Sequence, residues 1–577
     1  MVPTLLSVVI VGLGFQISGA ERLSKIHVSP TTGFFEDELG RTRLFRGINS
    51  VVKKHPWYDP QMLDPKRVQE LSDLGFNVIR LGTMWTGVMP ESSKLVNQTY
   101  VKALKTMAHG FAQSGMYTLL DMHQDLLWKV QARDDVGTYW GVPPWLKHLV
   151  QPHEKLFPWP LEQIGAWPCG YLTQEISRGF QSIYDNKNGT ARWLSVFWKH
   201  MASIFKADSH ILGYELINEP WAGDIFSDPS LLLPGVAGRK NLEPLYQQLH
   251  TVIREQDDET LIFWEPVTWA YTFPGSSHGL KDVILEAFFK NIKSYELSML
   301  IQAFCGTKSD TNNSELSNFI QNLMHSVTRN VTYQFSKGLG AKPSVFGTGF
   351  QTVPGGPDYR NRTVMSWHYY CWAWGFNGGN AEPFDPLIRD LCDNFLGPLE
   401  FQTVQDRTEE VGGSGRMLTE FGLCTPDITQ QHSKGFIECN FVIESADKQF
   451  ESWIYWDTAP GNQVLWDEKG HLIPDRAAVF SRPYPRAIDG IPTLLRFDIN
   501  TKVFRFEFWS ELRFGVYTEV FIPPLHYPNG NYRVDLSPQL IWLKDSKNVN
   551  VIKMSRNPTI PQAKSPQSYF VEITPFV

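Results

Sequence analysis

The sequence predicts an α/β protein, a (β/α)8 TIM barrel followed by a C-terminal β-sandwich. Short apolar runs alternate with helical patterns from about residue 40 to 460, which is typical of repeated βα units and a parallel sheet. After Pro483-Tyr484-Pro485 the pattern changes to strands of alternating polarity, separated by turns that contain proline and glycine. At 577 residues the chain exceeds one ordinary core, so we expect two domains.

Eight segments are candidate barrel strands: 44–48, 77–81, 117–122, 212–217, 261–264, 364–368, 417–419 and 453–456. Eight strands favour a closed barrel because closure leaves no exposed edge. Segments 64–74, 101–113, 191–205 and 242–255 carry apolar residues at helical spacing and are expected to form the outer ring.

We expect the barrel domain at residues 28–480 and the sandwich at 486–577. Two insertions interrupt the barrel, near 126–190 and 279–342. The first is rich in tryptophan and proline, so it forms either an aromatic wall over the site or a segment packed on the barrel. The second has apolar residues at helical spacing, and we expect packed helices there rather than an amphipathic lid.

Residues 1–20 have the pattern of a cleaved signal peptide, with an apolar core at 4–13 and small residues before the charged Glu21. No Lys or Arg precedes the core, so an uncleaved anchor is the alternative, although the run is short for spanning a bilayer. We expect a secreted protein or one of the endolysosomal or digestive lumen. Glycosylation sequons at Asn97, Asn188, Asn312, Asn330 and Asn361 fit that route.

The six cysteines could form up to three disulfides in that environment, and their spacing does not choose the pairing. Apolar residues make up 42% of the chain and charged residues 20%, which is the composition of a globular protein. The net charge is −7, and no basic stripe or phosphate-binding glycine loop is present, so we expect no nucleic-acid partner.

Two glutamates follow apolar runs at positions where a barrel holds its catalytic groups. Glu219 stands in Asn218-Glu219-Pro220 after the run 211–217, and Glu420 ends the run 417–419. Acetal hydrolysis needs one carboxyl to protonate the leaving oxygen and a second to attack the anomeric carbon or direct water. A separation of about 5 to 5.5 Å would give retention of configuration, and about 6.5 to 9.5 Å would give inversion.

An isolated glutamate at a strand end is more often a structural hydrogen-bond acceptor than a catalyst. Asn218 makes the Glu219 motif more specific, because its amide can donate to a sugar 2-hydroxyl. Glu265, in Phe263-Trp264-Glu265-Pro266, is the rival glutamate; we expect it to line the cleft.

Other polar side chains lie at further strand ends. Arg80 either keeps the nucleophile ionised or serves as a buried structural arginine. The group Asp121, His123 and Asp125 suits sugar hydroxyls better than a metal, and His368, Tyr370 and Trp456 suit orientation of the nucleophile and stacking of a pyranose. Any one of His368, Tyr370 and Trp456 taken alone would more often belong to the core.

Taken together, these residues resemble the retaining glycoside hydrolases of family 5, and among them the endoglycoceramidases. The order of Arg80, His123, Asn218-Glu219-Pro220, His368 with Tyr370, Glu420 and Trp456 carries the wider resemblance. The segments 46–53, 121–125, 367–371 and 482–488 carry the narrower one.

This resemblance implies hydrolysis of the β-glucosidic bond between oligosaccharide and ceramide, with Glu219 as acid/base, Glu420 as nucleophile and no metal or other cofactor. It also implies that Lys53, Asp121, His123, Asp125 and Asn218 contact the sugar next to the scissile bond, beside Tyr370 and Trp456. A glycosphingolipid substrate, transient contact with a membrane or micelle surface and a monomeric state are expected. Residues 279–342 depart from the family pattern. An endo-β-glucanase or mannanase acting on soluble polysaccharide, or a non-catalytic carbohydrate- or lipid-binding protein, are the alternatives.

Overall fold

Eight parallel strands form a closed barrel in the computed structural model, as the sequence predicted. The structure describes residues 22–128, 141–150, 152–164, 167–233, 235–267, 348–371, 382–384, 386–458 and 464–576. The strands are β4 (Arg46–Ser50), β5 (Val78–Gly82), β6 (Tyr117–Asp121), β7 (Ile211–Glu215), β8 (Leu261–Trp264), β9 (Thr363–Tyr369), β10 (Gly415–Gly422) and β11 (Trp453–Trp456). They pair in chain order, and β11 closes the barrel on β4.

The first barrel strand begins two residues later than predicted. Side chains supply part of the hydrogen bonding just before it: the Asn77 side-chain amide donates to the Leu44 carbonyl at 2.8 Å, and Ser452 Oγ accepts from the Phe45 amide at 3.0 Å. Leu44 and Phe45 are buried, which gave them the apolar pattern of a strand.

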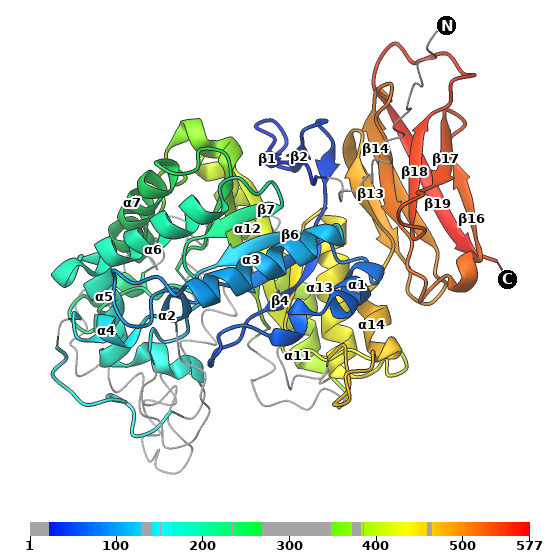
Figure 1. Ribbon diagram of the computed structural model, residues 1–577. Helices are drawn as coiled ribbons and strands as arrows, with labels where there is room; N and C mark the ends of the chain where they lie inside the picture. The colour runs from blue at the N-terminus through cyan, green and yellow to red at the C-terminus, as the bar shows by residue number, and fades with distance from the viewer. Residues whose placement is uncertain are drawn as a thin grey trace, which may run out of the picture.

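Helices surround the barrel (Figure 1). The longer ones are α1 (Pro65–Asp73), α3 (Gln98–Gln113), α5 (Gln174–Tyr184), α6 (Thr190–Phe205), α7 (Glu243–Arg254), α12 (Gly397–Glu410) and α13 (Lys434–Lys448). Shorter ones are α2 (Trp85–Val88), α4 (Pro144–Lys147), α11 (Pro386–Leu391) and α14 (Pro474–Phe480). The Asp64, Asn97 and Ser433 side chains cap α1, α3 and α13 by accepting from backbone amides of the first turn.

The C-terminal domain consists of two antiparallel sheets, drawn orange to red beside the barrel in Figure 1. The smaller sheet contains β13 (Ile491–Phe497), β14 (Phe504–Ser510), β19 (Gln567–Pro575) and β16 (Tyr532–Leu536). The larger contains β12 (Tyr484–Ile488), β15 (Thr518–Phe521), β18 (Val551–Arg556) and β17 (Leu540–Lys544). One apolar cluster, which includes Phe504, Phe506, Phe508 and Val571, fills the domain.

Strands near the N-terminus complete the larger sheet, which differs from the prediction that the barrel domain begins at residue 28. These are β1 (Ile26–Val28), β2 (Phe35–Asp37) and β3 (Thr42–Arg43), and β3 pairs with β12. Arg41 joins the two parts, because its guanidinium pairs with Asp37 and, at 2.9 Å, with Glu519 of β15. Two- and three-residue strands carry too little periodicity to be seen in sequence.

The first insertion packs on the barrel where the structure describes it. Trp128 Nε1 donates to Glu175 at 2.8 Å, Trp145 Nε1 donates to the Met89 carbonyl at 2.8 Å, and the Trp159 ring lies 5.0 Å from that of Phe226. These contacts favour the packing interpretation over an aromatic wall at those three positions. The second insertion, 279–342, and the signal segment 1–20 lie outside the described residues.

Two disulfides are present in the described part of the chain, Cys371–Cys392 and Cys424–Cys439. They bridge segments beside the last barrel strands. A search of the described residues finds no helix long and apolar enough to cross a bilayer.

Candidate active site

The predicted site residues converge at the carboxyl ends of the barrel strands. Arg80 and Asp121 lie on β5 and β6, His368 on β9, Glu420 on β10 and Trp456 on β11. Asn218 and Glu219 follow β7 by three and four residues, and Tyr370 follows β9 by one. The residues Arg80, Asp121, His123, Asp125, Asn218, Glu219 and Glu420 are each at most 7% exposed. The structure therefore brings these side chains together at one end of the barrel, and their roles stay predictions.

Arg80 is the centre of the arrangement. Its guanidinium donates to Glu215 Oε2, to Asn49 Oδ1 at 2.9 Å, to Glu420 Oε1 at 2.6 Å and to Asn218 Oδ1 at 2.8 Å. Burial alone would lower its pKa, but the facing carboxylates raise that pKa well above the ordinary value, so the cation is permanent. Arg80 thus links the Asn-Glu motif to Glu420.

Glu420 is held as a carboxylate acceptor. Besides the Arg80 bond, its Oε2 accepts from the Tyr370 hydroxyl at 2.9 Å. Burial, followed by the charge of Glu420, raises the pKa of Tyr370 well above its usual value, so the phenol keeps its proton and remains a donor. Two donors fix both oxygens of Glu420, which orients the carboxylate and stabilises its charge.

Glu219 occupies a different environment. Its backbone has a φ of 42°, an uncommon conformation for a residue with a Cβ, and its amide donates to Glu265 Oε2 at 2.8 Å. The Gln124 side-chain amide donates hydrogen bonds to two backbone carbonyls of this turn, those of Asn218 at 2.6 Å and Glu219 at 3.1 Å. These bonds hold the turn that points the Glu219 carboxyl towards His368, whose Nδ1 lies 3.0 Å from Glu219 Oε1.

Burial and the nearby carboxylate of Asp125 raise the pKa of Glu219 to about 7. At neutral and mildly acid pH the group therefore keeps a proton that it can donate. Burial lowers the pKa of His368 to about 4, so its imidazole is neutral and adds no charge between the two glutamates. Glycoside hydrolysis requires one carboxyl that donates a proton and a second that attacks, and a protonated Glu219 facing Glu420, whose two oxygens accept from Arg80 and Tyr370, suits that division.

One oxygen of Glu219 and one of Glu420 lie within 4.8 Å of each other, together with a His368 nitrogen. This spacing is shorter than the roughly 6.5 to 9.5 Å that leaves room for water in inverting enzymes. The same three groups are close enough to hold a divalent ion. Arg80 and Tyr370, however, already donate to both oxygens of Glu420.

A second module extends from the third strand. His123 Nδ1 lies 2.7 Å from Asp121 Oδ2, and Asp125 pairs with Lys53 Nζ. Burial alone would lower the pKa of His123, but Asp121 and Asp125 raise it to about 9. The His123 ring stacks on Trp456 at 5.2 Å, and the Lys53 ammonium lies 4.7 Å from the Trp456 ring centroid. These groups form a polar wall with an aromatic face, suited to a sugar ring.

Three contributing residues were not predicted as site residues. Glu215 and Asn49 are fully buried partners of Arg80, and Gln124 holds the Glu219 turn. Glu215 interrupts the apolar run 211–217, which was the available signal, because a buried strand has no other reason to carry a carboxylate. Glu265, expected only to line the cleft, instead accepts from the Glu219 amide.

The family model described as Cellulase (glycosyl hydrolase family 5) matches residues 37–462. The chain belongs to glycosyl hydrolase family 5. A second model, the glycoside hydrolase family 5 C-terminal domain, matches residues 482–564. The protein is accordingly a glycoside hydrolase with the barrel and C-terminal sheet domain of that family.

Within the family the chain is similar to endoglycoceramidases. It is 31% identical over 555 residues to the endoglycoceramidase of Cyanea nozakii, covering 91% of this chain and 90% of the relative. It is 29% identical over 553 residues to that of Hydra vulgaris, covering 89% and 83%. Endo-glycoceramidase II from Rhodococcus sp., solved as a ganglioside GM3 complex, has the same fold with a TM-score of 0.65 at 19% identity, covering 94% and 99%.

Proposed function

We propose that this enzyme hydrolyses the β-glucosidic bond between the oligosaccharide and the ceramide of glycosphingolipids, with retention of configuration, and releases both parts intact. The observation that carries the proposal is the asymmetric pair of glutamates, within 4.8 Å of each other. Glu219 is buried with a pKa of about 7, while Glu420 accepts from Arg80 and Tyr370. The substrate class is supported by the similarity to endoglycoceramidases over about nine tenths of the chain.

Glu420 attacks the anomeric carbon while protonated Glu219 gives its proton to the glycosidic oxygen of the leaving ceramide. Glu219, now ionised, then takes a proton from the water that hydrolyses the glycosyl-enzyme bond. Tyr370 and Arg80 already donate hydrogen bonds to Glu420 before the reaction. The same bonds stabilise the Glu420 carboxyl as its charge changes, so the site needs little reorganisation.

Asn218 is positioned for the sugar 2-hydroxyl. Its Oδ1 accepts from Arg80, and one hydrogen of its amide donates to the Gln124 carbonyl at 2.9 Å, which leaves the second hydrogen for substrate. Lys53, Asp125, His123 and Trp456 would then contact the sugar next to the scissile bond. The wall that they form is rigid before substrate binds, since Asp125 pairs with Lys53 and His123 stacks on Trp456.

We further propose that the protein acts as a monomer after secretion or in an endolysosomal or digestive lumen, with transient contact to a membrane or micelle surface. The sequence of residues 1–20 and the sequons support the route, and the two disulfides fit an oxidising compartment. A lipid substrate supports the surface contact. Amino-terminal sequencing of the secreted product, size-exclusion chromatography with light scattering and vesicle sedimentation test the three parts.

The deciding experiment incubates purified enzyme with a ganglioside, with lactosylceramide and with carboxymethyl cellulose, and analyses products by mass spectrometry. Intact oligosaccharide plus free ceramide from wild type, and none from Glu420→Gln, is the expected result. Stepwise loss of single sugars would exclude an endo-acting enzyme. Cleavage of cellulose alone would replace the lipid substrate by a soluble β-glucan while leaving the catalytic pair in place.

A further inference from the structure

A cluster of two histidines and an aspartate lies away from the catalytic end of the barrel. His109 belongs to α3, while Asp208 and His210 lie between the end of α6 and the start of β7. One side-chain donor atom from each lies within 4.8 Å of the others. Since Glu219 follows the far end of β7, the cluster and the catalytic pair are at opposite ends of the same strand.

Two polar atoms of this cluster are buried without a hydrogen-bond partner in the described part of the chain. They are His210 Nε2 and Asp208 Oδ2, and the His210 residue is only 8% exposed. A buried imidazole nitrogen without a partner costs stability, so such a group calls for an explanation. The His109 and His210 rings lie 4.9 Å apart at 56°, which is not a stacked pair that would explain their approach.

Lys105 is the neighbouring charge that could explain the aspartate. Its ammonium is 3.8 Å from Asp208 Oδ2, beyond hydrogen-bond distance, and donates instead to the Ile204 carbonyl at 3.2 Å. This long ion pair between Lys105 and Asp208 does not explain why the two imidazoles lie beside the aspartate.

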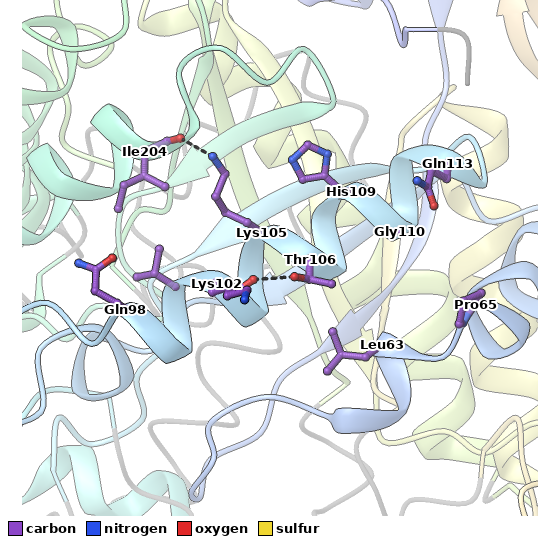
Figure 2. A pocket seen from close by; sticks show the side chains of 11 residues that line it. Leu63, Pro65, Gln98, Lys102, Lys105, Thr106, His109, Gly110, Gln113 and Ile204 are labelled. Atoms are coloured by element: carbon purple, nitrogen blue, oxygen red, sulfur yellow. Dashed lines mark hydrogen bonds between the residues drawn. The ribbon is translucent and has the colours of Figure 1, made fainter. Parts of the chain in front are cut away.

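A groove of about 570 Å³ reaches one member of the cluster, His109, and is lined otherwise by residues of α3, by Leu63 and Pro65 and by Ile204. Figure 2 shows Lys105 and His109 rising from the same side of α3, with Lys105 reaching the Ile204 carbonyl. Solvent therefore reaches the cluster at His109, its exposed member.

We propose that His109, Asp208 and His210 form a divalent transition-metal site of the kind that binds Zn²⁺, with water as a fourth ligand. Two imidazoles and a carboxylate are a donor set typical of zinc, and carbonyl-rich sites of Ca²⁺ or Mg²⁺ contain no such histidine pair. Tetrahedral Zn²⁺ bonds of about 2.0 to 2.1 Å place ligand atoms about 3.4 Å apart, so the donors must approach slightly. His109 is the exposed member of the three.

The bound ion would tie α3 to the start of β7 and so stabilise the fold without entering the reaction. This end of a (β/α)8 barrel contributes to stability rather than to catalysis. The role is therefore a structural cross-link, and it does not depend on the substrate proposed above.

The test titrates metal-free full-length protein with Co²⁺, whose visible absorption reports four-coordinate nitrogen and oxygen ligation, and then displaces it with Zn²⁺. We expect one ion per chain. His109→Ala and Asp208→Asn should each weaken binding by at least about 10-fold, because each loses a direct ligand. Lys105→Met should tighten binding, because it removes a competing cation next to Asp208.

Two controls locate the ion. His200→Ala changes an exposed histidine of α6 outside the cluster and should bind Co²⁺ like wild type. Glu420→Gln tests the catalytic cluster, which also brings a histidine nitrogen and carboxylate oxygens within 4.8 Å, and should leave binding unchanged. Zn²⁺ should also raise the melting temperature of wild type and not that of His109→Ala.

Equal Co²⁺ affinity in wild type and His109→Ala, or loss of binding in Glu420→Gln, would overturn the proposal. His109 is exposed, so its replacement keeps the test valid even if variants at the buried His210 fail to fold. Hydrolysis of glycolipid by the His109→Ala variant should equal that of wild type, and this readout separates a failed metal site from a failed assignment of function.

Discussion

The two ends of the barrel interior are built from the same strands and have opposite character. At the amino end, Val78, Leu119 and Val364 belong to an apolar cluster that Phe35 of the N-terminal hairpin joins. Two residues further along β5 and β6, Arg80 and Asp121 are equally buried but charged. Because side chains alternate in direction along a strand, residues two apart point to the same side in successive layers. Burial alone therefore does not distinguish structural residues from functional ones in this barrel. The hydrogen bonds and ion pairs of the buried charged groups make that distinction.

The largest expected effect is at the catalytic end. Glu420→Gln should lower kcat by about 10⁴-fold or more, since a neutral amide cannot form the glycosyl-enzyme bond. Its fold should persist, because Arg80 retains Glu215 and Asp121 as partners. Circular dichroism and product analysis measure the two outcomes. Substantial residual turnover would assign the nucleophile elsewhere.

At the amino end of the barrel we expect a loss of stability and little loss of activity. Leu119→Ala removes a fully buried side chain from the apolar cluster and should lower the free energy of unfolding by about 2 to 5 kcal/mol. The kcat of the folded fraction should stay within a factor of two or so of wild type, because the catalytic groups lie in a separate layer. Chemical denaturation and active-site titration test this. A loss of kcat without a loss of stability would show that the two layers are coupled.

Glu265 tests whether a neutral buried acid supports the site. Burial, then the charges of Glu219 and Glu215, raise its pKa well above the usual value, so it is protonated. Glu265→Gln should keep nearly wild-type activity, whereas Glu265→Ala, which leaves the Glu219 amide without its acceptor, should lose about 10- to 100-fold in kcat. A large loss in Glu265→Gln would show that the ionised form is needed.

Glu438 sharpens the comparison, since it is a buried acid with no catalytic neighbour. Both of its oxygens lack a partner in the described part of the chain, and burial raises its pKa to about 8, well above the ordinary 4.5. The folded state therefore holds a proton that the unfolded state releases. The stabilising contribution is complete below about pH 4.5 and is lost as pH rises through about 8.

Glu438→Gln should accordingly exceed wild type in stability at pH 9 by about 1 to 3 kcal/mol and show little difference at pH 4. Its kcat should be unchanged at every pH where both proteins are folded. Melting curves at the two pH values are the measurement. Equal stability of the two proteins at pH 9 would contradict the assignment of a buried proton.

The smallest effect is a displacement of the pH profile. Activity should fall as pH rises through about 7, because Glu219 then loses the proton that it must donate. After burial, Asp125 is the group that raises this pKa most. Asp125→Asn should move the basic limb of kcat/KM to lower pH by about one unit. A basic limb at the same pH in both proteins would mean that burial, and not Asp125, sets the pKa of Glu219.

The sequence alone predicted the barrel and the C-terminal sheet domain, which the structure confirms, and it singled out the pair Glu219 and Glu420. Strand ends are readable from apolar runs, and the parallel barrel brings those ends together, so Glu219 and Glu420 followed from local patterns. Asn218-Glu219-Pro220 and Arg80 were readable for the same reason.

Only the tertiary structure decided which environment each of these groups has. The pKa of Glu219 depends on burial and on Asp125 and Lys53 from other loops. The orientation of the Glu420 carboxyl depends on the hydrogen bond that it accepts from Arg80 of β5. The roles of Glu215, Gln124 and Glu265 and the place of β1 to β3 in the sandwich likewise rest on contacts between distant segments. A pKa and a sheet edge are set by what surrounds a residue in space, and a linear sequence specifies only what surrounds it along the chain.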